Sequence, residues 1–322
     1  MLEVKDLTTY YKTRQGPNQA LEELSFKLEH GEMLGLIGES GCGKSTAAVT
    51  IMRLLFGSGE HIKGQVMLDG LDIMNVSQKD FEKITWKDIA LIPQSAMNAL
   101  NPVYNVGKQI NEAIMLHYPG MSKANATEKT KKLLKQVGLD ERWFNAYPHK
   151  LSGGMKQRAI IAMAFSCDPK VLISDESTTG LDVIIEAQIL ALLKNLQKAR
   201  NLSIIIISHD LRMVTSICDR IAIMYAGVLV EIGKVEDVAR NGRHPYTRAL
   251  FNSQVNLDSL DIAVESIEGV VPKLINPPAY CRFYGRCKSR TDFCRENSPP
   301  ALKEISSDHQ CACYNLLEEM AV

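Results

Sequence analysis

The sequence predicts an α/β protein whose main sheet is mostly parallel. Short apolar runs typical of buried strands occur at residues 33–37, 171–174 and 203–208. A helical pattern from Lys44 to Leu55 follows the first run, and an amphipathic stretch from Val183 to Arg200 separates the other two. Because strands that alternate with helices form parallel sheets covered by helices, this order favours an α/β core.

Length and charge narrow the class of protein. The 322 residues suffice for one large domain with an appendage, or for two domains. The formal net charge is zero, so no overall positive field attracts nucleic acid, and we expect no nucleic-acid partner. The first seven residues include acidic side chains and no apolar core, so we expect no secretory signal. Apolar runs such as 204–207 are far shorter than the roughly 20 residues that cross a bilayer. We therefore expect a soluble chain that reaches a membrane only through partners.

The pattern changes twice along the chain. Between Pro102 and Ala164 the periodicity is helical without convincing strands. This predicts a helical subdomain, at about residues 100–165, inserted between two strands of the core. From Arg243 onward the chain is rich in loops and prolines and holds five of the eight cysteines. We therefore predict a main domain over residues 1–242 and a small C-terminal extension over residues 243–322.

The segment Gly38–Ser45 matches the phosphate-loop pattern G-x-x-x-x-G-K-[ST], between an apolar strand and a helix. Glycines let successive N–H groups surround an anion, and the helix N-terminus adds positive partial charge. In this pattern Lys44 reaches the β- and γ-phosphates of ATP, and the Ser45 hydroxyl binds Mg²⁺. A chance glycine-rich turn is the alternative, which the strand and helix disfavour. Cys42 occupies a variable position, where we expect a filler rather than a redox switch. The predicted ATP-binding residues of this segment are Gly38, Ser40, Gly41, Cys42, Gly43, Lys44, Ser45 and Thr46.

A second element of the phosphate site follows the strand at 171–174. Asp175 and Glu176 come directly after it, at the edge where open α/β sheets bind ligands. We expect Asp175 to hold Mg²⁺, through water, and Glu176 to polarise the water that attacks the γ-phosphate. Such a pair alone is often a solvated loop, and only the phosphate loop makes it informative.

Between these elements, Leu151–Arg158 has the sequence L-S-G-G-M-K-Q-R, which resembles the signature motif of ABC ATPases. Ser152, Gly153 and Gly154 would open a helix whose N–H groups meet a γ-phosphate. The resemblance implies a P-loop NTPase fold of the ABC type, with an antiparallel β-subdomain beside the core. It also implies a head-to-tail dimer, in which this motif caps the ATP of the opposing subunit.

Further motifs follow in the order that this family has. Gln94 resembles the Q-loop glutamine that senses Mg²⁺, and Asp182, in Gly-Leu-Asp, resembles the D-loop. His209 resembles the switch histidine that contacts the γ-phosphate, although a histidine after a strand is usually structural. Tyr11 matches the aromatic residue that stacks on adenine, with the adjacent Tyr10 as the alternative.

One position departs from the family pattern. Ser177 stands where the family usually has proline after the catalytic glutamate. No charge or donor that handles ATP is lost by this change, so we expect hydrolysis to be retained. Because Glu176 and His209 are present, we disfavour a regulatory or scaffold protein with little turnover.

The resemblance extends to one branch of the family. Residues 95–102, S-A-M-N-A-L-N-P, are similar to the importers of oligopeptides, dipeptides and nickel. So are His244–Thr247 and the tail segment 277–287, and the similarity is greatest to the dipeptide importers. Tyr280 departs from the glycine that this branch usually has before the first tail cysteine.

The tail cysteines Cys281, Cys287 and Cys294 have neither the spacing of zinc ribbons nor that of ferredoxins. Spacing therefore favours a thiolate metal site without naming the metal. The resemblance implies a [4Fe–4S] cluster with a structural or redox-sensing role and a fourth ligand near the chain end. By the same resemblance Cys313 is that ligand and Cys311 the spare. Zinc and reduced structural cysteines are the alternatives.

The resemblance implies an ATP hydrolase that energises the import of dipeptides or oligopeptides, or else of nickel or another small solute. Its expected partners are a second ATPase subunit, identical or homologous, two transmembrane permease subunits and, indirectly, a solute-binding protein. It would lie at the cytoplasmic face of the membrane. A soluble ABC ATPase of DNA repair or translation is the other candidate. The chain has neither the long coiled coils of the first class nor the two cassettes of the second.

Overall fold

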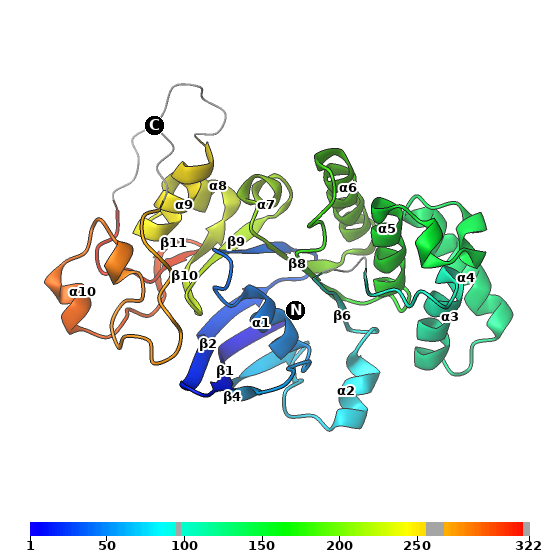
Figure 1. Ribbon diagram of the computed structural model, residues 1–322, viewed down its shortest axis with the longest axis horizontal. Helices are drawn as coiled ribbons and strands as arrows, with labels where there is room; N and C mark the ends of the chain where they lie inside the picture. The colour runs from blue at the N-terminus through cyan, green and yellow to red at the C-terminus, as the bar shows by residue number, and fades with distance from the viewer. Residues whose placement is uncertain (95–97, 256–266, 318–322) are drawn as a thin grey trace. The chain divides into compact units, whose positions relative to one another are not determined.

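The computed structural model describes residues 1–94, 98–255 and 267–317, which divide into two compact units (Figure 1). The first unit contains residue 1 and residues 28–32 and 75–206, and the second contains residues 2–27, 33–74 and those from 207 onward. Residues 95–97, at the start of the segment that resembles the peptide and nickel importers, lie outside the described residues.

Buried strands form the centre of the first unit. They are β6 (Ile89–Ile92), β7 (Val171–Asp175) and most of β8 (Ser203–Ser208), in the order β8-β7-β6. β6 and β7 are parallel, with Ile89 opposite Val171 and Ile92 opposite Ser174. All residues of β7 and β8 are buried, which explains their uninterrupted apolar sequences. The strands predicted at 171–174 and 203–208 are therefore confirmed.

Helices make up the rest of the first unit. α2 spans Gln78–Ile84, and α3 (Val106–His117), α4 (Lys123–Gln136) and α5 (Gly153–Ala164) form the predicted inserted helical subdomain (Figure 1, teal to green). Short 3-10 turns at 141–145 and 148–150 connect α4 to α5. α6 spans Val183–Arg200 as predicted, because the Asp182 carboxylate accepts the Ile185 N–H at 2.9 Å and Asn201 ends the helix in a left-handed conformation.

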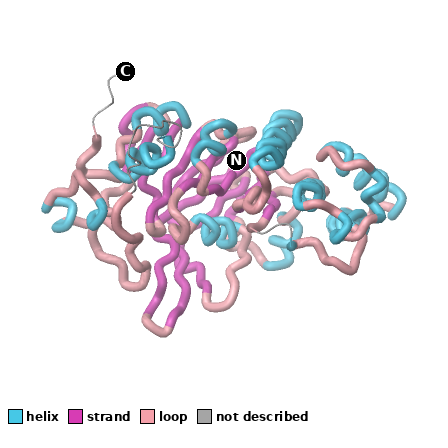
Figure 2. The backbone as a smooth tube through the Cα atoms, turned by 45° about the horizontal axis from the view of Figure 1, so that its top comes forward, coloured by secondary structure: helices cyan, strands magenta, loops and turns pink. Residues whose placement is uncertain are grey.

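The second unit contains the antiparallel β-subdomain that the resemblance implies. Its strands are β1 (Leu2–Thr13), β2 (Gly16–Leu28), β4 (Gly59–Leu68) and β5 (Leu71–Asp72), in the order β2-β1-β4-β5. β1 and β4 are antiparallel, with Leu2 opposite Leu68 and Tyr11 opposite Gly59. Figure 2 distinguishes the strands, in magenta, from the helices in cyan.

A second group of strands in this unit has the order β11-β12-β10-β9-β3. β3 (Met33–Ile37) is parallel to β9 (Arg220–Tyr225), which is antiparallel to β10 (Val228–Lys234). The C-terminal hairpin β11 (Lys303–Ser306) and β12 (His309–Cys311) extends this sheet through β10. The domain boundary near Arg243 stays a prediction. The helices of the unit are α1 (Lys44–Ile51), α7 (Leu211–Ile217), α8 (Val235–Asn241), α9 (Pro245–Val255) and α10 (Asp292–Glu296).

The helix predicted from Lys44 to Leu55 was too long, since α1 ends at Ile51. Arg53 is left-handed at φ 52°, and its N–H donates to the Thr50 carbonyl while Leu54 N–H donates to that of Val49. This pair of bonds is a Schellman ending, in which glycine usually holds the left-handed place. Because arginine stands there instead, the sequence carries no stop signal. Among the described residues, no helix is both long and apolar enough to span a membrane.

Candidate functional site

The phosphate loop belongs to the second unit and needs glycine at specific positions. Gly41 and Gly43 have φ of 80° and 105°, a region that glycine enters without strain. A Cβ on Gly43 would lie 2.5 Å from the Ala20 carbonyl oxygen, and one on Gly38 would lie 2.2 Å from the Met224 carbonyl oxygen. The chain after β3 can therefore pass this close to its neighbours only with these glycines.

The loop encloses the Lys44 side chain. Lys44 Nζ donates to the carbonyl oxygens of Gly38 at 2.7 Å and Glu39 at 3.1 Å, and the residue is 4% exposed. Ser45 and Thr46, in the first turn of α1, are half-buried, whereas Ser40 and Gly41 are exposed. Cys42 is fully buried, and this burial raises the pKa of its thiol, which suits a packing role better than a reactive one.

Two more predicted residues lie in the second unit. His209 is exposed, at the turn between β8 and α7. The residues on either side of His209 stabilise the turn. Asp210 N–H donates to Ser208 Oγ at 2.9 Å, and the Asp210 carboxylate caps α7. On β1, the Tyr10 hydroxyl donates to Glu22 at 3.0 Å, and a Cβ on Gly59 would come within 2.8 Å of the Tyr11 ring. Since adjacent strand residues face opposite sides, only one of the two tyrosines can serve as the platform for a base.

Asp175 and Glu176 lie in the first unit, at the end of β7. Asp175 is buried, at 4% exposure, whereas Glu176 is half-buried and left-handed at φ 42°. The exposed Gln94, which follows β6, donates from Nε2 to Glu176 Oε2 at 2.8 Å. Ser177, at the unusual position, is 2.6 Å from Ser174 Oγ, so one hydroxyl donates to the other. The two motifs recognised separately in the sequence thus meet at Glu176.

The signature segment also lies in the first unit. Ser152 is exposed and caps α5, where its Oγ accepts the Met155 N–H at 3.4 Å. A Cβ on Gly154 would lie 2.7 Å from Ile185 Cγ2, so the start of α5 packs against the start of α6. Asp182, which resembles the D-loop aspartate, caps α6. Ser152 and Asp182 therefore begin two helices that are in contact.

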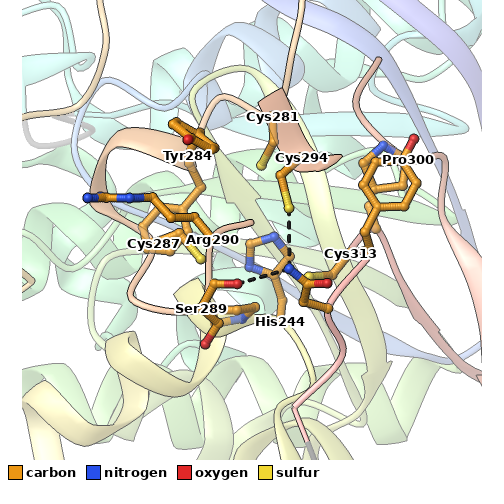
Figure 3. A pocket seen from close by; sticks show the side chains of 14 residues that line it. His244, Cys281, Tyr284, Cys287, Ser289, Arg290, Cys294, Pro300 and Cys313 are labelled. Atoms are coloured by element: carbon orange, nitrogen blue, oxygen red, sulfur yellow. Dashed lines mark hydrogen bonds between the residues drawn. The ribbon is translucent and has the colours of Figure 1, made fainter. Parts of the chain in front are cut away.

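In the C-terminal tail, four cysteines line one small pocket (Figure 3). They are Cys281, Cys287, Cys294 and Cys313. Cys311, which pairs with Glu231 between β12 and β10, is buried and does not line it. Of the two candidates for a fourth ligand, Cys313 therefore shares the pocket with the other three.

Three of the thiols that line this pocket have raised pKa values. Burial raises the pKa of Cys281 and Cys287, and it raises that of Cys313 to about 12. His244 also lines the pocket, and burial lowers its pKa to about 4, so that neutral Nδ1 accepts the Tyr246 N–H at 3.0 Å. Among the described residues, no three His, Cys, Asp or Glu side chains are close enough to hold a single metal ion.

Two residues that the sequence did not predict contact the phosphate loop, and a third contacts a turn that is bonded to it. Arg286 donates to the Glu39 carboxylate, the Tyr246 hydroxyl accepts the Glu39 N–H, and Arg282 contacts the turn after β9. In the sequence, the segments 244–247 and 277–287 indicate a branch of the family and no contact with the phosphate loop. Two arginines between two cysteines were the available signal, but nothing local in the chain indicates what they contact.

Comparison with known proteins places this geometry in a family. The ABC transporter family matches residues 21–179, and the oligopeptide/dipeptide transporter C-terminal region matches residues 230–294. The dimeric structure of MJ0796, a bacterial ABC transporter cassette, is similar with a TM-score of 0.66 at 27% identity, over 73% of this chain and 99% of that one. The same cassette in a post-hydrolysis state with ADP and Pi has the same score.

Curated relatives match over nearly the whole chain. The oligopeptide transport ATP-binding protein OppD of Salmonella typhimurium is 41% identical over 99% of this chain and 95% of its own length. The dipeptide transport ATP-binding protein DppD of Haemophilus influenzae is 40% identical over 99% of this chain and 96% of its own length. The chain therefore belongs to the ABC transporter family, among the ATP-binding subunits that carry the oligopeptide/dipeptide C-terminal region.

Proposed function

We propose that this chain binds and hydrolyses ATP to energise a membrane importer of dipeptides or oligopeptides. The relatives that match almost its full length are named for the transport of these peptides. The observation that carries the catalytic part is the contact between Gln94 and Glu176 at the end of a buried strand. It brings the Q-loop residue to the carboxylate that would activate water.

ATP binding follows from the chemistry of the predicted residues. Tyr11 stacks on adenine, and the loop N–H groups with Lys44 bind the phosphates. Ser45, Gln94 and, through water, Asp175 would hold Mg²⁺ with oxygen atoms of the kind that it prefers, and the buried carboxylate of Asp175 would provide the charge. Bound Mg²⁺ would neutralise charge on the β- and γ-phosphates.

Hydrolysis requires a base at the attacking water and a donor at the γ-phosphate. Glu176 accepts a proton as the water oxygen bonds to the γ-phosphorus, and the bond from that phosphorus to the β–γ bridging oxygen breaks, giving ADP and phosphate. His209, exposed at the end of β8, donates a hydrogen bond to a γ-phosphate oxygen. Gln94 orients Glu176 through the hydrogen bond that the structure contains.

A second ATPase subunit, identical or homologous, completes the site. We propose that Ser152, Gly153 and Gly154 cap the γ-phosphate of ATP bound to the facing subunit, with Asp182 beside it. The exposed Ser152 at the start of α5 suits this role, because a helix N-terminus binds anions. Two permease subunits would bind this dimer at the cytoplasmic face of the membrane and receive the peptide from a solute-binding protein.

We also propose that the cysteine pocket holds a [4Fe–4S] cluster, bound by Cys281, Cys287, Cys294 and Cys313. The four thiols line one pocket, and four soft thiolates are the usual ligands of such a cluster. Zinc also binds four thiolates, so the iron and sulfide content of the protein distinguishes the two.

Transport itself gives the test of the main proposal. The chain should be assembled with its permeases and partner ATPase in liposomes, with a labelled dipeptide and solute-binding protein outside and ATP inside. Uptake should depend on ATP and stop with Glu176→Gln. ATP-dependent uptake of nickel without uptake of any peptide would contradict peptide as the substrate.

The cluster has a separate test with a matched control. Cys294→Ser and Cys311→Ser each remove one buried thiol, but only Cys294 lines the pocket. Protein purified without oxygen should contain iron and acid-labile sulfide, which Cys294→Ser loses and Cys311→Ser keeps. Iron-free wild-type protein, or equal loss in both variants, would contradict this site.

A further inference from the structure

The tail segment Cys281–Cys287 contacts the phosphate loop through the side chain of Arg286. Arg286 Nη1 donates to both carboxylate oxygens of Glu39, at 2.9 and 3.1 Å. The rest of the guanidinium is also bonded, since Nη2 donates to the Ile267 carbonyl and Nε to that of Glu268, each at 3.0 Å. The Arg286 side chain is only 8% exposed, so water competes little with these bonds. Arg286 therefore has one defined position against the loop.

Glu39 is bonded at its backbone as well. Its N–H donates to the Tyr246 hydroxyl at 3.1 Å. Tyr246 lies in α9, is fully buried and packs on the rings of Tyr225 and Phe283, with centroids 4.7 and 5.4 Å away. Phe283 belongs to the same tail segment as Arg286. The backbone N–H of Glu39 is thus bonded to a residue that packs on the tail, and its carboxylate is bonded to a residue of the tail itself.

Arg282 provides a second connection, which is indirect and runs through the turn after β9. It is 9% exposed and donates to the Ala226 carbonyl and, at 3.1 Å, to Gln19. The next residue, Gly227, donates its N–H to the Cys42 carbonyl at 2.9 Å. Gly227 has φ 87°, and a Cβ there would come within 2.9 Å of Arg282 Nη1. The turn that bonds to Cys42 therefore packs directly on Arg282.

Charge explains why an arginine is needed at position 286. Glu39 follows Gly38, whose carbonyl oxygen accepts a hydrogen bond from Lys44 in the segment that would bind phosphate. A carboxylate there repels a nucleotide triphosphate unless a cation offsets it. Arg286 supplies this cation and fixes the carboxylate at the same time.

We propose that Arg286 and Arg282 form a clamp on the phosphate loop, with Arg286 the residue that positions Glu39 and neutralises its charge for ATP binding. The clamp makes nucleotide affinity depend on the folding of the cysteine tail, because both arginines lie between Cys281 and Cys287. The inference rests on the proposed role of Gly38–Ser45 as the phosphate loop.

The test compares Arg286→Gln with Arg295→Gln. Arg295 is an exposed residue of α10 in the same tail and does not line the cysteine pocket, so it controls for a general effect of losing a tail arginine. Affinity for a fluorescent ATP analogue should fall about 10-fold in Arg286→Gln, the effect of one lost charge-assisted bond pair, and stay unchanged in Arg295→Gln. Arg286→Lys should lose less affinity than Arg286→Gln, because an ammonium group keeps the positive charge beside Glu39 although it cannot make the bonds of Nε and Nη2.

Two further variants separate positioning from general destabilisation. Adding Glu39→Gln to Arg286→Gln should recover most of the lost affinity, since no unpaired carboxylate is left near the phosphates. If Arg286→Gln does not fold, Tyr246→Phe removes only the hydroxyl that accepts the Glu39 N–H and should weaken ATP binding about 3- to 10-fold. Wild-type affinity in the folded variant, or no recovery with Glu39→Gln, overturns the clamp.

Lys44→Ala shows which hypothesis fails. If this variant loses ATP binding while Arg286→Gln and Tyr246→Phe bind as wild type, the clamp is wrong and the phosphate loop stands. If Lys44→Ala binds ATP as well as the wild type does, the assignment of the loop itself is wrong.

Discussion

The phosphate loop and the turn at Glu176 are stabilised in different ways. Glu39 of the loop is bonded by Arg286 and Tyr246, which are 8% exposed and fully buried and come from the C-terminal half of the chain. Around Glu176 the contacts include an exposed glutamine and a pair of serine hydroxyls three residues apart. Exposed hydrogen bonds exchange with water at little cost, whereas buried ones are expensive to break. Glu39 of the phosphate loop, on the nucleotide-binding side, is therefore firmly positioned. The side chain of Glu176, on the hydrolytic side, is adjustable because its bond to Gln94 is exposed.

The largest expected effect separates ATP hydrolysis, at Glu176, from ATP binding, at the phosphate loop. Glu176→Gln removes the base and keeps the shape of the side chain, so ATP hydrolysis should fall by about 10²- to 10⁴-fold with ATP affinity unchanged. The variant should also accumulate an ATP-bound dimer, detectable by size-exclusion chromatography. Glu128→Gln, an exposed glutamate in α4, is the control. Normal hydrolysis in Glu176→Gln would rule out the proposed base.

The next effect tests the rigidity of the loop. Gly43→Ala places a Cβ 2.5 Å from the Ala20 carbonyl at φ 105°, so we expect ATP affinity to fall by roughly 10-fold or more and unfolding free energy to fall by about 1–3 kcal/mol. Calorimetry of binding and of unfolding measures both. At Gly120→Ala, where no heavy atom lies within 4 Å, neither quantity should change. Equal behaviour of the two variants would mean that the loop is not constrained.

A smaller effect is expected on the adjustable side. Gln94→Ala removes the amide that donates to Glu176 at 2.8 Å, so turnover should fall about 3- to 10-fold, the effect of one exposed hydrogen bond. Thermal stability should not change. Gln78→Ala, which breaks an exposed bond to Glu82 in α2, should leave turnover unchanged. A loss as large as that of Glu176→Gln would mean that Gln94 does more than orient the base.

The smallest effect concerns the departure from the family pattern. Ser177→Ala removes a hydrogen bond to Ser174 of 2.6 Å, so stability should fall by about 1 kcal/mol while turnover changes less than about 3-fold. Ser216→Ala, which breaks a local bond in α7, should lower stability similarly. If turnover were lost in Ser177→Ala alone, the serine would take part in hydrolysis, contrary to our account.

Local patterns predicted much of this molecule. The strands at 33–37, 171–174 and 203–208 and the helix over 183–200 form as expected, because burial and capping are recorded in neighbouring residues. The end of α1 could not be predicted, since Arg53 takes the left-handed place of a glycine. The family resemblance, not the spacing, identified the Gln94 and Glu176 motifs as partners.

The clamp on the phosphate loop lay beyond prediction for a physical reason. Arg286 and Glu39 are 247 residues apart, and each has an ordinary local sequence context. Their contact depends on β9, α9 and the tail packing together, which no periodicity reveals. The preference for Cys313 over Cys311 came from resemblance, and in the structure only Cys313 lines the pocket with the other three cysteines.

The central claim is that a nucleotide on the phosphate loop of one subunit is completed by Ser152–Gly154 of a second subunit. The most direct measurement mixes two tagged forms of the Glu176→Gln chain in assembled dimers, one of which also carries Lys44→Ala. An ATP analogue with a photoreactive γ-phosphate then binds only to the intact loop. Our account predicts label at residues 152–154 of the Lys44→Ala form. Label confined to the subunit whose own loop binds the nucleotide would contradict it.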